Sequence, residues 1–168
     1  MRQFLLGLAL ALCTGATAMS AEPPTPKGHE SELWGTYKLV STTFKLMDTG
    51  EEETWTNDAG YITYTREGRM FVIIIRDPRP HPKSIAATTD AERVELTKTA
   101  NAYSGPYTFD GKDIVHHIDI ASNGVWNDTV QVRHARMEGD KVILSVDPTG
   151  RPTDGRLSTT TLIWQKVK

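Results

Sequence analysis

After about residue 33, the chain consists of short runs in which apolar and polar residues alternate, separated by turns that contain glycine. Many residues in these runs are β-branched or aromatic, which favours strands over helices. The Asp110-Gly111 pair is the strongest hairpin signal between two such runs. The predicted strands span residues 34–47, 60–65, 70–76, 103–109, 113–120, 129–137, 141–146 and 157–167. The pattern therefore predicts about eight strands joined by sequential turns.

Residues 71–82 depart from this alternation of apolar and polar positions. The apolar run 71–75 does not alternate, so we expect it to be buried on both faces, under the segment that follows. Pro78, Pro80 and Pro82 then predict a loop, because proline cannot donate to a strand ladder. The charged residues 76–79 at the start of this loop are expected to be solvated.

A helix is predicted after the loop. It spans residues 90–101, with Thr89 or Asp90 as the N-cap and acidic residues in the first turn. We expect Val94 to face the body of the protein. A loop plus one helix is long for a β domain, and long loops are often functional, so residues 77–102 are predicted to be an insertion that acts as a lid.

The strand order predicts the fold class. Sequential hairpins of this number close most simply into an all-β, antiparallel up-and-down barrel, because closure removes exposed sheet edges. A barrel of about eight strands has room for side chains or for one small ligand. A β-sandwich is the structural alternative.

The N-terminal residues are predicted to be a secretory signal peptide. Arg2 precedes the apolar run 4–12, and Ala16-Thr17-Ala18 matches a cleavage site. The apolar run is shorter than the roughly 20 residues that span a bilayer. The signal peptide is therefore expected to end at Ala18 or Ala21.

Removal of this segment defines the expected mature protein. It would consist of a flexible leader, residues 22–30, and a barrel domain, residues 31–168. No later apolar run is long enough to be a transmembrane segment. We expect a protein that is exported, either to the periplasm or as a secreted protein.

Composition and charge exclude several classes of function. The formal net charge of −2 lacks the basic footprint that a nucleic-acid binder needs. The one cysteine, Cys13, lies in the signal peptide, so the mature chain can form neither a disulfide nor a cysteine-based zinc site. Glycine-rich phosphate loops and metal-ligand spacings are missing from the sequence, and no metal or cofactor is predicted. The oligomeric state stays open.

Ordered short matches make the chain similar to the bacterial lipocalin-like domain family. They cover nearly all of residues 33–167 and lie at residues 33–41, 60–65, 68–70, 103–107, 115–118, 131–133, 138–140, 144–145 and 162–164. The resemblance implies a lipocalin-type barrel with a cavity, and no particular activity. The chain departs from the family pattern at Tyr37, where a tryptophan is usual, and at Asn127-Asp128, where a glycine is expected after the tryptophan.

Two adjacent histidines, His116 and His117, are candidates for acid/base chemistry. Successive side chains of a strand point to opposite faces, so only one of them can enter the barrel, and a metal site made by the pair is not expected. His116 shares its face with Ile114 and Ile118, which favours His116 as the inward residue, but the choice between the two histidines stays open. A pair between His116 and His134 of the next strand is conceivable. A half-buried, hydrogen-bonded structural histidine is the alternative to an acid/base group.

Arg133 has two possible orientations. Amphipathic alternation places Val130 and Val132 inside the barrel and Arg133 in water. The family resemblance favours an inward Arg133, where it would bind a carboxylate or stack on Trp164. Both orientations stay open at this point.

Aromatic residues with polar tips suit the wall of a small-molecule site, although they could equally fill a core. The predicted ligand-binding residues are Tyr64, Tyr103, Tyr107, His116, His117, Trp126, Arg133 and Trp164. The leading hypothesis is an exported protein that binds a small hydrophobic or amphipathic molecule. One alternative is a barrel enzyme of the isomerase, cyclase or hydrolase type, with His116 or His117 as acid/base, and another is an envelope interaction module with a filled barrel. Whether the protein is an enzyme stays open, with a non-enzymatic binder favoured.

Overall fold

The computed structural model describes residues 24–151 and 154–168. The predicted signal peptide, residues 1–21, lies outside the described residues, as do its two cleavage sites. The end of the predicted leader is attached to the barrel: the carboxylate of Glu30 accepts hydrogen bonds from the backbone N–H groups of Lys27, Gly28 and Phe109.

The described residues form two helices and ten strands. The helices are α1 (Glu30–Leu33) and α2 (Asp90–Lys98). The strands are β1 (Gly35–Leu46), β2 (Glu52–Trp55), β3 (Ala59–Tyr64), β4 (Arg69–Ile75), β5 (Ala100–Phe109), β6 (Asp113–Ile118), β7 (Ile120–Ala121), β8 (Thr129–Glu138), β9 (Lys141–Gly150) and β10 (Leu157–Lys166).

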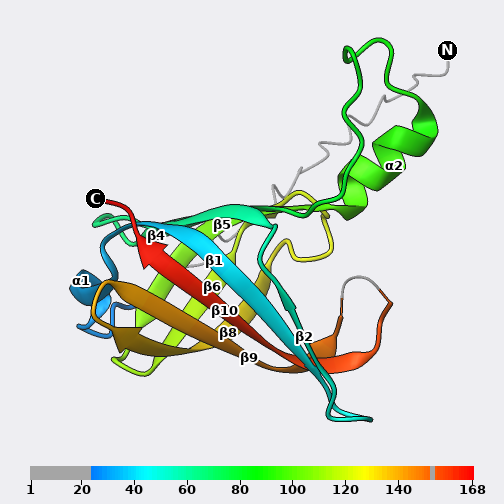
Figure 1. Ribbon diagram of the computed structural model, residues 1–168. Coiled ribbons are helices and arrows are strands. Elements are labelled where there is room, and N and C mark those ends of the chain that lie inside the picture. The colour runs from blue at the N-terminus through cyan, green and yellow to red at the C-terminus, as the bar shows by residue number, and fades with distance from the viewer. Residues whose placement is uncertain (1–23, 152–153) are drawn as a thin grey trace, which may run out of the picture.

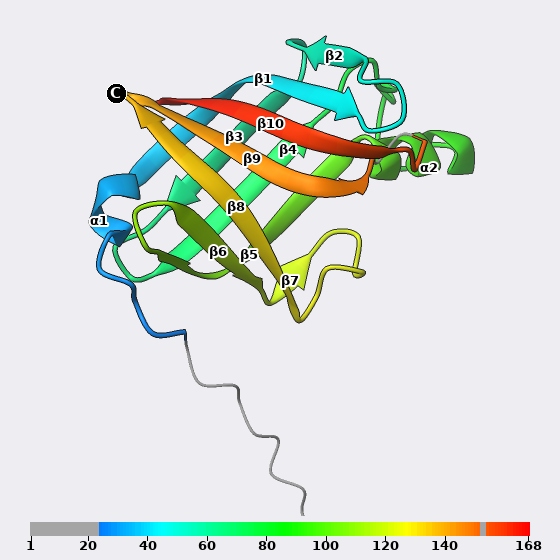
Figure 2. The same cartoon turned by 90° about the horizontal axis from the view of Figure 1, so that it is seen from below.

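Eight strands close into a barrel, in the order β1-β3-β4-β5-β6-β8-β9-β10, and β10 pairs back with β1 (Figure 2). Every pairing is antiparallel. The two short strands lie off this ring, with β2 on the second half of β1 and β7 on β5. The predicted all-β, antiparallel barrel of about eight strands is confirmed, and the β-sandwich alternative is excluded because the sheet is closed on itself.

The barrel is filled at the end that carries α1. Leu33 of this helix is fully buried, and so are large side chains that lie at the same end of their strands, among them Tyr37, Phe109 and Trp164. Tyr37 replaces the tryptophan that is usual in the family, and its ring packs edge-on against Tyr64 with 6.5 Å between the ring centroids. The aromatic substitution therefore keeps the end of the barrel closed.

Strand β4 is buried on one face only, and the expectation of two buried faces is wrong. Met70, Val72 and Ile74 point into the barrel, whereas Phe71 and Ile73 are half-exposed on the outside. The segment that follows does not fold back over this face, because it projects away from the barrel (Figure 1). The run of apolar residues therefore behaves as an ordinary half-buried strand.

The projecting segment contains the predicted helix. Thr89 is its N-cap and forms a capping box with Glu92, because the Thr89 side chain accepts from the Glu92 backbone and the Glu92 carboxylate accepts from the Thr89 backbone. The helix ends at Lys98 rather than at residue 101, because residue 100 already pairs with β4 in the barrel. Val94 is half-exposed, so the expectation that it faces the body is wrong.

A second departure from the family pattern has a local explanation. Asp128, in the turn before β8, has a φ of 60°, the left-handed region that favours glycine. Aspartate tolerates this region better than most residues, because its short side chain can form local hydrogen bonds. Asn127 also contributes, since its side-chain oxygen accepts from the backbone N–H of Ala121 at 2.7 Å. The chain therefore makes this turn without glycine.

Gly105 of β5 is required by a close approach of two backbones. A Cβ atom at this position would lie 1.8 Å from the carbonyl oxygen of His117 and 2.8 Å from its carbonyl carbon. The backbone runs beside β5 here on its way from β6 to β7, and the N–H of Asp119 donates to the carbonyl oxygen of Ser104 at 3.1 Å. A side chain would push these strands apart.

We predict that Gly105→Ala lowers the free energy of unfolding by about 3 kcal/mol or more, because neither backbone can move without breaking barrel hydrogen bonds. Gly150→Ala is the matched control, since a Cβ there makes only an ordinary contact of 3.4 Å with Gly155. This control should change stability by less than about 0.5 kcal/mol. Urea unfolding followed by tryptophan fluorescence measures both, and equal midpoints for the two variants would contradict the prediction.

Candidate ligand-binding cavity

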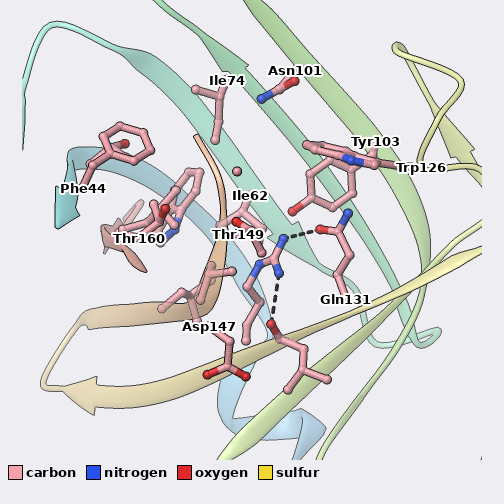
Figure 3. A pocket seen from close by; sticks show the side chains of 18 of the residues that line it. Phe44, Ile62, Ile74, Asn101, Tyr103, Trp126, Gln131, Asp147, Thr149 and Thr160 are labelled. Carbon is pink, nitrogen blue, oxygen red and sulfur yellow. Dashed lines mark hydrogen bonds between the residues drawn. The ribbon is translucent and has the colours of Figure 1, made fainter. Parts of the chain in front are cut away.

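A cavity of about 490 Å³ occupies the end of the barrel opposite α1 (Figure 3). Its walls come from the ends of the strands that lie away from the filled end, and from the loop before β8. The apolar and aromatic residues of the wall include Phe44, Ile62, Ile74, Tyr103, Trp126, Leu144, Leu162 and Trp164. The polar residues include Thr42, Arg76, Asn101, Gln131, Arg133, Asp147, Thr149 and Thr160. The barrel is thus packed at one end and hollow at the other.

Arg133 points into this cavity. Along β8, Gln131 and Arg133 lie on the inner face, while Val130 and Val132 are 60% and 41% exposed. The orientation that follows from amphipathic alternation is therefore wrong, and the structure has the inward alternative. The physical reason is that this part of the barrel interior is a cavity rather than a core, so a polar side chain can point inward and remain solvated.

The guanidinium of Arg133 has polar partners but no acidic one. It donates to the side-chain oxygen of Gln131 and to the backbone carbonyl of Val132, the latter at 3.0 Å. Asp147 also lines the cavity, but it is 78% exposed and accepts a hydrogen bond from His134 Nε2 at 3.1 Å. No ion pair among the described residues includes Arg133.

His116 is the histidine that enters the barrel. It is fully buried, and its Nε2 is hydrogen-bonded to the hydroxyl of Tyr64 at 2.9 Å, while its Nδ1 is buried without a partner. Burial lowers the pKa of His116 well below its usual value, and the positive charge of Arg133 lowers it further. His116 is therefore neutral at physiological pH. His117 lies on the opposite face of the strand and is half-buried.

His134 does not pair with His116. Its Nδ1 is 2.7 Å from Asp113 and its Nε2 is 3.1 Å from Asp147, and these two carboxylates raise the pKa of His134. In the strand register, His134 lies opposite Asp113, whereas His116 lies opposite Gln131. The conceivable histidine pair is thus absent because the register separates the two residues.

The predicted ligand-binding residues divide into three groups. Four of them line the cavity: Tyr103, Trp126, Arg133 and Trp164. Three lie in the packed interior and are not part of the cavity wall: Tyr64, Tyr107 and His116. The remaining one, His117, points outward. The Tyr107 hydroxyl donates to the carbonyl of Thr65 at 3.0 Å, and burial raises the pKa of Tyr107 to about 12. The interior tyrosines therefore serve packing.

Arg76 is a wall residue that the sequence did not reveal. It was expected to be solvated, but its side chain is only 11% exposed. Its guanidinium lies 5.8 Å from the ring centroid of Trp55, and its Nε is 3.8 Å from the buried carboxylate of Asp58. Burial lowers the pKa of Arg76, and the charge of Asp58 opposes this effect. Asp58 lies just before β3, and proximity between such distant segments cannot be read from spacing.

The predicted lid does not cover the cavity. Arg76 separates the cavity from a second hollow of about 710 Å³, and the projecting segment lines this outer hollow through Asp77, Pro78 and Lys98. Residues 77–100 contribute nothing to the wall of the barrel cavity itself. The cavity therefore opens beside the projecting segment in this structure.

Other residues of the wall carried a weaker signal. Gln131 lies two residues before Arg133 on the same strand, so the two side chains point to the same face, which is the inner one. Phe44, Asn101, Thr149 and Thr160 lie near strand ends, where alternation does not distinguish a cavity wall from a filled core. Within the described parts of the chain, no group of three or more His, Cys, Asp or Glu side chains is arranged to hold a metal ion. None of the helices in the described residues is long and apolar enough to cross a membrane.

A closed antiparallel barrel with one packed end and one hollow end defines a class of small β-barrel proteins that can enclose a ligand. The model of the lipocalin-like domain family matches residues 34–167, and the chain belongs to this family. The comparison with curated proteins finds no match. Among solved structures, an uncharacterised protein from Bacteroides eggerthii is similar, with a TM-score of 0.42 and 10% identity over 80% of this chain and 99% of that chain. Nothing is inferred from a likeness at this level.

We predict that His116 makes the barrel sensitive to acid. Below about pH 6.5 the unfolded chain takes up a proton at this residue and the folded barrel does not, so stability falls as the pH falls. Relative to His116→Gln, which is neutral throughout, the wild-type protein should lose about 1 kcal/mol more between pH 7.5 and 5.5. Urea unfolding across this pH range measures the difference, and the opposite effect of His134 cancels because both proteins contain it.

A second measurement needs no variant. The ring protons of His116 should show no titration by NMR between pH 8 and 5, because the buried imidazole stays neutral. Parallel stability profiles for the two proteins, together with normal titration of His116, would contradict the prediction.

Proposed function

We propose that this protein is exported and binds one small hydrophobic or amphipathic molecule in the barrel cavity. The observation that carries the proposal is the cavity itself. Its volume of about 490 Å³ lies within the range of about 300–1,000 Å³ that is typical of small-molecule sites. Its wall combines apolar and aromatic side chains with polar ones, a combination that can give a ligand both affinity and orientation.

Two aromatic residues of the cavity wall support this proposal. Trp126 and Tyr103 pack edge-on with 5.5 Å between their ring centroids, and both line the cavity. A ligand that covers them would remove apolar surface from water, at roughly 2.5 kcal/mol for each 100 Å². Trp126 is held by the loop before β8, where its backbone N–H donates to Asn123 and its carbonyl accepts from Thr129. This part of the wall is thus preorganised to bind an apolar group of a ligand.

The two alternatives find less support. An interaction module with a filled barrel does not account for the cavity. The barrel enzyme was predicted to use His116 or His117 as its acid/base group, but His116 is not part of the wall and His117 points outward. Small-molecule binding is the function that uses the observed geometry.

We predict that a neutral apolar probe binds in the cavity. N-phenyl-1-naphthylamine should bind one-to-one with a saturable rise in fluorescence, because the apolar wall excludes water from the dye. Leu162→Trp, which fills the cavity, should weaken this binding about tenfold or more, the loss expected when an apolar contact region of the ligand is excluded. Ile163→Trp is the matched control, since Ile163 is the next residue of β10 and does not line the cavity.

The binding curves of these proteins decide the proposal. Saturable binding by the wild-type protein and by Ile163→Trp, with weak binding by Leu162→Trp, is the expected result. Absence of saturable binding by the wild-type protein, or equal binding by all three, would show that the barrel interior does not take up the probe.

We predict that export removes the N-terminal segment. When the full chain is produced in a bacterium with a periplasm, intact-mass measurement of the envelope fraction should show a protein that begins at Met19 or Glu22. Leu8→Arg interrupts the apolar run and should leave an uncleaved chain in the cytosol. A wild-type protein that keeps residues 1–18 and stays in the cytosol would refute the proposed export.

A further inference from the structure

We propose that the ligand of this barrel is an amphipathic carboxylic acid, with its carboxylate on Arg133 and its apolar body extending toward the mouth. This inference rests on the proposed function and specifies the chemical class of the ligand. It is argued from the hydrogen-bond donors, the charges and the arrangement of the cavity.

The inner part of the cavity contains hydrogen-bond donors that have no carboxylate partner among the described residues. A guanidinium has five N–H groups, and the contacts of Arg133 within the described chain are one with Gln131 and one with Val132. Because the Gln131 oxygen accepts from Arg133, the other end of the amide presents N–H groups. Figure 3 shows Gln131 and Tyr103 pointing into the same part of the cavity. A carboxylate accepts from such a set of donors.

The charges of the wall favour an anion. The acidic residue of the wall, Asp147, is mostly exposed and bonded to His134. Arg76, a second guanidinium of the wall, has its Nε 3.8 Å from Asp58, beyond hydrogen-bond distance, and its Nε and one terminal nitrogen are buried without a partner. Asp58 is thus the counter-charge of Arg76, whereas Arg133 has no acidic partner among the described residues. The planar guanidinium of Arg133 can hold a carboxylate through two parallel hydrogen bonds.

The arrangement along the barrel axis requires an amphipathic molecule. Arg133 lies opposite Ile114 in the strand register, and Ile114 belongs to the packed core, so the base of the arginine side chain is at the inner end of the cavity. Phe44 and Ile74 lie near the outer ends of β1 and β4. A molecule that places its acid on Arg133 thus has its apolar body between aromatic and aliphatic walls. A small inorganic anion would leave these walls uncovered.

The test compares an acid with its own amide. 6-Phenylhexanoic acid and 6-phenylhexanamide have nearly the same shape and differ in charge at pH 7. Each competes with N-phenyl-1-naphthylamine for the wild-type protein. We expect the acid to bind about 10- to 100-fold more tightly than the amide, the range expected for a charge-assisted hydrogen-bonded pair.

Variants of Arg133 assign the preference to this residue. Arg133→Met should lower the affinity for the acid by the same factor and change the affinity for the amide by less than about threefold. Arg133→Lys keeps the charge without the bidentate geometry and should retain part of the preference. Arg136→Met is the matched control, because Arg136 lies on the same strand, is exposed and pairs with Glu138. It should behave as the wild-type protein does.

The outcomes separate this inference from the proposed function. Saturable dye binding with equal affinity for acid and amide would refute the acidic ligand and leave small-molecule binding intact. The comparison on the wild-type protein holds even if an Arg133 variant fails to fold. An acid preference that persists in Arg133→Met would place the anion elsewhere and overturn the assignment. Absence of dye binding by the wild-type protein would refute both proposals.

Discussion

The pairing of β10 with β1 is the constraint on which the rest of this structure depends. It converts a sheet of sequential hairpins into a closed ring, so that the sheet has an inside and an outside. The register runs from Tyr37 opposite Lys166 to Leu46 opposite Ser158, with one irregularity between Leu39 and Ser41. The one cysteine, Cys13, lies in the predicted signal peptide. Hydrogen bonds and side-chain packing, rather than a disulfide, therefore hold the predicted mature barrel closed.

Closure also divides the interior into two parts with different rules. At the α1 end, large side chains such as Tyr37 and Phe109 fill the barrel, and inward positions are apolar as in any protein core. At the other end the strands enclose a cavity of about 490 Å³, and inward positions there include Gln131 and Arg133. The rule that hydrophobic residues point inward and polar residues point outward thus holds in only one half of the barrel.

This division explains how much the sequence could predict. The strands and their sequential order follow from the period of two and from turn chemistry, both of which act locally. The inward direction of His116 was favoured by Ile114 and Ile118 on the same face, but the sequence did not decide between the two histidines. The orientation of Arg133 could not be predicted in this way. Alternation assigns the more apolar face of a strand to the interior, and it does not indicate whether that interior is a core or a cavity. Because Val130 and Val132 form the more apolar face of β8, alternation assigned them to the interior and Arg133 to the solvent, which is wrong.

Features that depend on distant segments were also beyond the sequence. Arg76 and Asp58 come together because β3 and β4 pair, so that residues near the two strand ends become neighbours. The segment around α2 could be predicted as a loop and a helix, but not as a projection away from the barrel. Its direction depends on tertiary contacts, which a helix of nine residues with no buried side chain does not reveal in its own sequence.

The boundary between the two halves couples them electrostatically. His116 and Tyr64 lie in the packed interior, and the charge of Arg133 in the cavity contributes to the low pKa of His116. An anion bound to Arg133 would offset that charge and so ease protonation of His116. By linkage, protonation of His116 would strengthen binding of the anion by the same factor. Burial remains the larger cause of the low pKa of His116. The bound anion would therefore raise this pKa only in part, and His116 would stay neutral. A neutral imidazole beneath the cavity therefore leaves Arg133 as the positive charge that an acidic ligand would meet at the inner end of the barrel.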